Sequence, residues 1–160
     1  MFFWFVGTAV VTVWFVFRDP LFDYRLLIVG SLLPTVVDAF FRGARVLHSL
    51  TFSVVLLAVL MIATPRGSQI RRTLLALPIG TLLGLVFTGA WTNNHVFWWP
   101  FLGWSFHDAA HPVAARGWWN VLLELIGIGL CTWVFLRAEL RDSERRRMFW
   151  RSGRLALPIR

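Results

Sequence analysis

The sequence has few charged residues, a single cysteine and no lysine. Charged residues make up 15% of the 160 residues and hydrophobic ones 58%, whereas soluble domains carry about 25% charged residues. A soluble fold of this size could not bury so much apolar side chain with so few charges left for its surface. Cys131 alone cannot form an internal disulfide. These absences exclude a soluble enzyme, a secreted disulfide-rich module and a disordered regulator, and they predict a polytopic membrane protein.

Five apolar stretches are candidates for membrane-spanning helices: 1–17, 26–41, 46–63, 73–91 and 118–136. A helix rises about 1.5 Å per residue and the hydrocarbon core is about 30 Å thick, so the last three should span comfortably and the first two are short. The second contains Gly30, Pro34 and Asp38 and is expected to be broken or re-entrant. The predicted fold is an all-α membrane bundle of four to five transmembrane segments over 1–136, followed by a basic amphipathic tail over 137–160.

Arginine supplies all sixteen basic residues and orients the bundle. Cytoplasmic segments of membrane proteins are enriched in basic residues, and a five-pass chain with its N-terminus outside places thirteen arginines in the cytoplasm. If 26–41 does not cross and the N-terminus is inside, eleven arginines lie in cytoplasmic segments and five in outer ones, so five passes are preferred. The N-terminus has no positive region or cleavage signal and is expected to remain as an anchor. Both arrangements place the C-terminus in the cytoplasm.

Tryptophan marks the opposite side. Six of the ten tryptophans lie between Trp91 and Trp119, and indole rings favour the headgroup layer of a bilayer. This segment is therefore expected to be an outer loop folded onto the membrane, either as an anchor or as a surface for lipid or a partner. His107 and His111 within it would share a helical face, but Pro112 argues against a helix and a metal site there.

Three ionisable residues lie within the apolar stretches: Asp38, His48 and Glu124. Such residues are costly in a membrane and usually have a partner or a function. One interpretation is a structural network in which Arg42 or Arg45 pairs with a carboxylate. The other is a metal site, complete or degenerate.

At these residues the chain resembles a known family. The matching segments, in order, are Gly30–Asp38 (GSLLPTVVD), Arg45–Leu50 (RVLHSL), Gly80–Gly89 (GTLLGLVFTG) and Phe97–Phe101 (FWWPF). They are similar to the YdjM-like family of LexA-binding, inner-membrane-associated metal-dependent hydrolases. The resemblance implies a bacterial plasma-membrane protein.

The chain also departs from this family. Where the family has two aspartates and a histidine, this sequence has Thr35, Thr88 and Gly84. Glycine offers no ligand, threonine is a poor one, and a catalytic zinc site needs about three protein ligands. We therefore expect no catalytic residues and no cofactor, with Asp38, His48 and Glu124 as weak metal candidates only.

The replaced positions suggest packing instead. Gly80, Gly84 and Thr88 follow one another at intervals of four, which places small residues on one helix face. Such seams let two helices approach closely. The seam is expected to pack inside this chain's own bundle; alternatively it, or the pair Gly127 and Cys131, contacts a partner subunit.

The C-terminal tail is rich in arginine beside the last apolar stretch. Juxtamembrane clusters of this kind bind anionic lipid headgroups, so membrane lipid is the expected contact and a cytoplasmic protein the next. Nucleic acid is not expected. The candidate residues are Arg141, Arg145, Arg146, Arg147 and Arg151.

The sequence favours two functions. The first is a non-catalytic accessory subunit of a larger plasma-membrane complex, for example one that transports lipid or envelope lipid, bound to other integral membrane subunits. The alternative is an integral-membrane metal-dependent hydrolase with an altered site.

Overall fold

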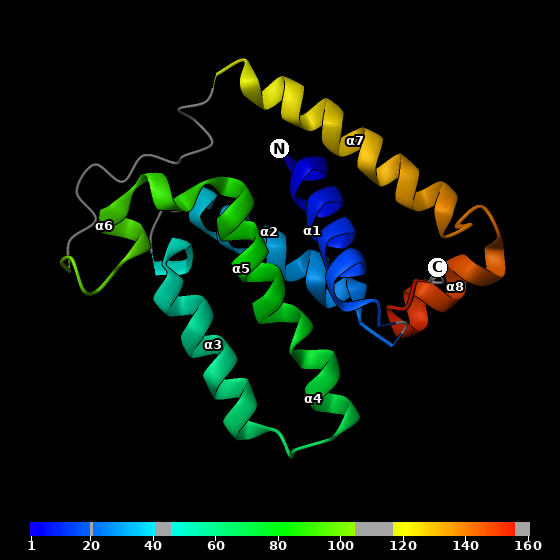
Figure 1. The fold of residues 1–160 in the computed structure, drawn as a ribbon, viewed down its shortest axis with the longest axis horizontal. Helices are drawn as coiled ribbons and strands as arrows, with labels where there is room; N and C mark the ends of the chain where they lie inside the picture. The colour runs from blue at the N-terminus through cyan, green and yellow to red at the C-terminus, as the bar shows by residue number, and fades with distance from the viewer. Residues whose placement is uncertain (20, 41–45, 105–116, 156–160) are drawn as a thin grey trace.

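A computed structural model describes residues 1–19, 21–40, 46–104 and 117–155, without the side chains of residues 38 and 39. Within these ranges the chain is helical and contains no strand. The helices (Figure 1) are α1 (Phe2–Phe17), α2 (Tyr24–Phe40), η1 (Val46–His48), α3 (Leu50–Ala63), α4 (Gln69–Leu74), α5 (Ala76–Thr88), η2 (Ala90–Thr92), α6 (Asn94–Phe97), α7 (Trp119–Arg137) and α8 (Ser143–Ser152). The predicted all-α class is confirmed for this part of the chain.

Two helical segments are long and apolar enough to cross a membrane. They are Gln69–Thr88, which joins α4 to α5 and has 20 residues, and α7, which has 19. The helices α1, α2 and α3 are apolar but shorter. The break between α4 and α5 falls at Leu75, directly after Leu74, whose carbonyl has no partner at Pro78 because proline lacks an N–H.

The stretch 46–63 is not the single long helix that the sequence predicted. The structure divides it into η1 and α3, and α3 has only 14 residues. The division occurs at Ser49, whose extended backbone and side chain cap α3, because its hydroxyl accepts a hydrogen bond from the Phe52 N–H at 3.1 Å. Serine is one of the preferred N-cap residues of a helix. Its extended backbone at this position separates η1 from α3.

The second stretch is continuous, and the prediction of a broken segment is wrong. The helix α2 runs through Pro34 without interruption over 17 residues. A proline ring collides with the carbonyl four residues earlier and removes one hydrogen bond. In a membrane-type helix these losses are tolerated where neighbouring helices support the backbone, and α2 has its most extensive contact with α5.

The α2–α5 pair is held by direct backbone contact. A Cβ on Gly84 would lie 2.5 Å from the carbonyl oxygen of Ser31, and one on Gly80 would meet the carbonyl oxygen of Leu27. Gly30 on α2 faces Gly80 in turn. Leu27 on α2 is paired with Gly80 on α5, and Ser31, one turn later, is paired with Gly84, one turn later on α5. The two helices therefore run parallel.

The helices α1 and α7 form a second pair of the same kind. A Cβ on Gly7 would lie 2.9 Å from the Cβ of Leu130, and one on Gly127 would lie 2.5 Å from the Cα of Trp4. Further along, the rings of Trp14 and Trp133 are 5.3 Å apart. Contacts that advance together along both helices make this pair parallel as well (Figure 1).

The remaining helices surround these two pairs. The helix α3 packs beside α5 and leaves much of its apolar surface exposed, including Val59 and Ile62. The C-terminal helix α8 folds back toward the α1–α2 connection (Figure 1). Leu155, just after it, is buried in the same cluster as Phe22, Tyr24 and Ala138.

Candidate functional site

The three metal candidates lie on different elements. His48 ends η1 and is 1% exposed, whereas Glu124 lies on α7, which packs against α1. Asp38 belongs to the last turn of α2, and its side chain is outside the described set. Among the described residues, no group of three His, Cys, Asp or Glu side chains is placed to hold a metal ion.

Glu124 is engaged by the first turn of α1. Its Oε1 accepts hydrogen bonds from the backbone N–H groups of Phe2 at 3.0 Å and Phe3 at 3.2 Å, and its Oε2 accepts one from Trp4 at 3.4 Å. The first N–H groups of a helix have no partner within the helix and favour a negative charge. Glu124 therefore caps α1 from a neighbouring helix. The arginines that the sequence offered as its partners, Arg42 and Arg45, lie outside the described residues.

Two of the positions where the resembled family carries ligands, Gly84 and Thr88, are buried in this chain. Gly84 lies against the Ser31 backbone, as described above. The hydroxyl of Thr88 is fully buried and donates to the carbonyl of Gly84 on its own helix. Gly80 and Gly84 thus lie at the interface between α5 and α2 within one chain, and Gly127 and Cys131 lie opposite Gly7 on α1.

A polar junction joins α8 to the start of α2, and sequence reasoning did not single it out. Asp23 is 3% exposed and accepts hydrogen bonds from the Arg25 backbone N–H at 3.0 Å and from its guanidinium at 3.0 Å. Arg25 also donates to the Trp150 carbonyl at 2.7 Å, and the Tyr24 N–H donates to the Gly153 carbonyl at 2.8 Å. An aspartate directly before an apolar run is a helix-start signal that could have located Asp23, but its second partner, α8, could not be foreseen.

The predicted arginine candidates of the tail have three different environments. Arg145 forms an ion pair with Glu139 at 3.0 Å. Arg146, Arg147 and Arg151 line a hollow of about 390 Å³ with Ser143 and Trp150. Arg141 lies in the connection between α7 and α8, and is exposed.

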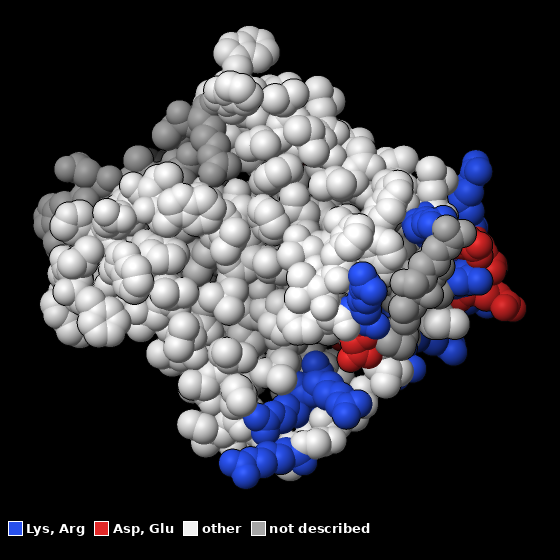
Figure 2. Space-filling model, viewed as in Figure 1, with Lys and Arg blue, Asp and Glu red and all other residues white. Residues whose placement is uncertain are grey.

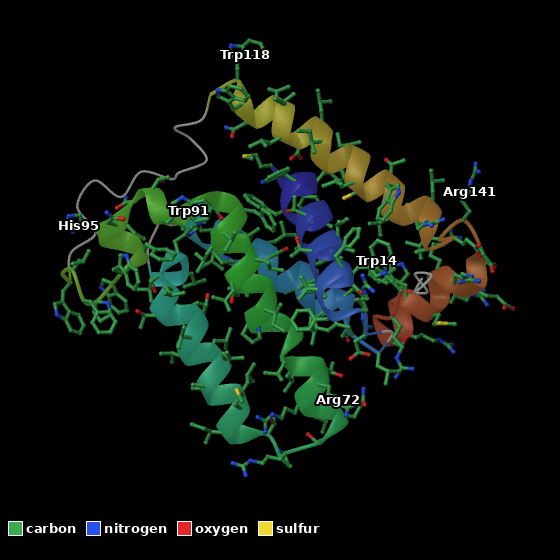
Figure 3. The ribbon with its side chains drawn as sticks, in the orientation of Figure 1. Trp14, Arg72, Trp91, His95, Trp118 and Arg141 are labelled. Atoms are coloured by element: carbon green, nitrogen blue, oxygen red, sulfur yellow. The ribbon has the colours of Figure 1, made fainter. Side chains whose placement is uncertain are left out.

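Two labelled tryptophans and two labelled arginines lie at different ends of the molecule (Figure 3). Trp91 and Trp118 lie at one end in Figure 3, and Arg72 and Arg141 lie toward the other. In Figure 2 the blue side chains cover the α3–α4 connection and the surroundings of α8, and the described surface around α6 and the start of α7 shows no charge. At the aromatic end Trp104 is 78% exposed and Trp118 is 87% exposed. The segment between them, with His107 and His111, lies outside the described residues.

Comparison with known proteins adds no relative. The chain matches no family model, no curated protein and no solved structure.

Proposed function

We propose that this chain is a multi-pass protein of the bacterial plasma membrane, with its N-terminus outside and its C-terminus in the cytoplasm. The segments α1, α2, α3, α4–α5 and α7 would each cross once, in alternating directions. The first and fifth crossings must then run parallel, and so must the second and fourth. The α1–α7 and α2–α5 contacts have this orientation.

The parallel α1–α7 pair argues against four passes. If residues 26–41 did not cross, α1 and α7 would be the first and fourth crossings and would run in opposite directions. The arginines of α4 and α8 lie away from Trp91 and Trp118 (Figures 2 and 3), which agrees with a cytoplasmic C-terminus in either arrangement, because basic residues favour the cytoplasmic side.

Cysteine accessibility tests this topology. In a Cys131→Ala background, single cysteines are placed at residue 1 and at residue 160 and exposed to a membrane-impermeant maleimide in intact cells. We expect labelling at residue 1 before lysis and at residue 160 only after it. Labelling of residue 1 only after lysis would restore the four-pass model.

We further propose that the protein is a non-catalytic accessory subunit of a larger membrane complex. The observation that carries this proposal is the exposed surface of α7. The helix contacts α1 through one face containing Glu124, Gly127 and Cys131, while Leu125 is 61% exposed and Leu136 is 56% exposed. A transported or modified lipid is the proposed cargo of the complex, because the chain itself offers mainly apolar surface and little soluble mass.

Gly129 provides a sharp test of this surface. A Cβ at Gly129 would meet nothing within 4 Å in this chain, so Gly129→Leu should leave the fold intact. A partner helix packed against this small residue would be pushed away. Ala58→Leu on the exposed face of α3 is the matched control.

The readout is purification in mild detergent followed by mass spectrometry of the recovered proteins. We expect integral membrane subunits to co-purify with the unaltered chain and with Ala58→Leu, and to be lost from Gly129→Leu. Recovery of the unaltered chain alone, monomeric and at full yield, would exclude the accessory-subunit proposal.

The alternative function, a hydrolase using Asp38, His48 and Glu124, gains no specific support. Glu124 already accepts three backbone hydrogen bonds from α1. It would have to release them in order to bind a metal.

A further inference from the structure

The helix α8 presents a basic face that the bundle does not use. Ser143, Arg147 and Arg151 stand four residues apart, and so do Arg146 and Trp150, a spacing that places all five side chains on one side of a helix. Together they line the hollow of about 390 Å³. The opposite side of α8 faces the protein, where Phe149 packs against the core cluster. The hollow therefore opens away from the bundle.

The bundle fixes this face in place. The Trp150 carbonyl accepts from Arg25, and the Gly153 carbonyl accepts from the Tyr24 N–H. At the other end Asp142 caps the helix by accepting from the Glu144 N–H at 3.1 Å. The contacts of Trp150 and Gly153 hold the C-terminal end of α8 against the bundle, and the Asp142 cap stabilises its first turn, so less ordering of the helix backbone is needed on binding.

The three arginines of the hollow keep their charges available. Arg145 is neutralised by Glu139 at 3.0 Å, but Arg146, Arg147 and Arg151 have no carboxylate within ion-pair distance among the residues that the structure describes. Arginine has a planar fork of donors that suits phosphate oxygens. Three such groups around one hollow favour a ligand with a phosphate group.

The position of α8 favours a lipid as the source of that phosphate. On the proposed topology α7 ends at Arg137 on the cytoplasmic side, and α8 begins six residues later, which places it at headgroup level. Trp150 is 69% exposed, and indole favours the headgroup layer.

We propose that the face formed by Ser143, Arg146, Arg147, Trp150 and Arg151 binds the phosphate of an anionic phospholipid in the cytoplasmic leaflet. This inference rests on the proposed membrane topology but not on the proposed accessory role. It also narrows the arginine-rich tail to three residues, and assigns Arg145 to the Glu139 ion pair instead.

The test measures lipid bound to the full-length chain by native mass spectrometry in detergent. Phosphatidylglycerol is compared with phosphatidylcholine, which has the same phosphate but no net charge, and with inorganic phosphate as a competitor. We expect one phosphatidylglycerol to be retained in preference to phosphatidylcholine, and excess inorganic phosphate not to displace it. Equal retention of the two lipids, or displacement by phosphate alone, would overturn the proposal.

A matched pair of variants locates the site. Arg146→Gln/Arg147→Gln/Arg151→Gln removes three charges from the hollow, and Arg66→Gln/Arg71→Gln/Arg72→Gln removes three from the α3–α4 region. We expect the first to lose about 100-fold in affinity for phosphatidylglycerol, from roughly fivefold for each arginine, and the second to retain it. Equal losses in both variants would show general charge attraction and contradict a site on α8.

Two measurements keep this result separate from other failures. The lipid comparison on the unaltered chain needs no variant, so it decides the question even if a variant does not fold. Membrane fractionation and the cysteine labelling described above test the topology directly. A chain that is membrane-inserted with its C-terminus in the cytoplasm, yet shows no preference for phosphatidylglycerol, would refute this inference alone.

Discussion

Replacing Gly84 by alanine tests whether backbone contact holds α2 and α5 together. The new Cβ would lie 2.5 Å from the Ser31 carbonyl oxygen and 3.3 Å from its Cα, and ordinary contact begins at 3.4 Å. The helices must therefore separate locally by about 0.9 Å, because backbone atoms cannot rotate away as a side chain can. Overpacking costs about 1–3 kcal/mol. The ratio of folded to unfolded protein should fall by about 5- to 160-fold, since 1.36 kcal/mol is a factor of ten.

Gly129→Ala is the control, because it makes the same chemical change in a helix where the Cβ meets nothing within 4 Å. Alanine favours a helix interior over glycine by about 0.5–1 kcal/mol, so this variant should be as stable as the unaltered chain or more stable. Thermal unfolding of both variants in one detergent, followed by circular dichroism, gives the comparison. If Gly84→Ala unfolds at the same temperature as Gly129→Ala, the argument from backbone contact is refuted.

Three other changes test the remaining contacts. Glu124→Leu should lower the unfolding temperature more than Glu124→Gln, because the amide keeps an acceptor for α1 whereas hydrogen bonds to a charged group contribute about 1.5–3 kcal/mol; equal values would show that the cap contributes little. Gly153→Ala should loosen the packing of α8 against the bundle, because the backbone φ at Gly153 is 71° and the new Cβ would meet the Asp23 carboxylate. Faster proteolysis of the connection between α7 and α8 would report the loosening, and an unchanged rate would contradict the docking of α8. Gly84→His with Thr88→Asp should unfold the bundle without gaining metal by elemental analysis, and a stable, metal-loaded variant would instead favour an altered hydrolase site.

Hydropathy predicted where helices occur because the bilayer argument depends on composition, and α1, α2, α5 and α7 all lie within or overlap the predicted stretches. Helix ends were harder to predict, because they depend on local hydrogen bonds that hydropathy does not measure. A single hydroxyl at Ser49 shortens α3, whereas Pro34, the stronger helix breaker in isolation, leaves α2 continuous against α5. The sequence showed both residues but not which neighbour would support the backbone.

The glycine spacing predicted a close-packed face but left its partner open. Gly80 and Gly84 define one side of a helix from the sequence alone, and any helix with an exposed backbone could occupy it. The choice of α2 depends on the backbone of Leu27, Gly30 and Ser31, which lies against Gly80 and Gly84 on a helix that runs in the same direction. Matching small residues on two candidate spans would have been a usable signal for this pairing, since close approach requires both surfaces to be small.

Glu124 shows why polar residues within apolar helices are hard to interpret from sequence. A carboxylate in an apolar stretch must have donors or a cation nearby, because an isolated charge there is too costly. A metal ion, an arginine and the open N–H groups of a helix all satisfy that requirement with the same side chain. Which of these partners Glu124 has depends on the position of α1, whose first turn points at Glu124 and supplies three N–H donors at 3.0 to 3.4 Å. Because α1 stands more than a hundred residues away in the chain, no local pattern around Glu124 could distinguish a ligand from a cap.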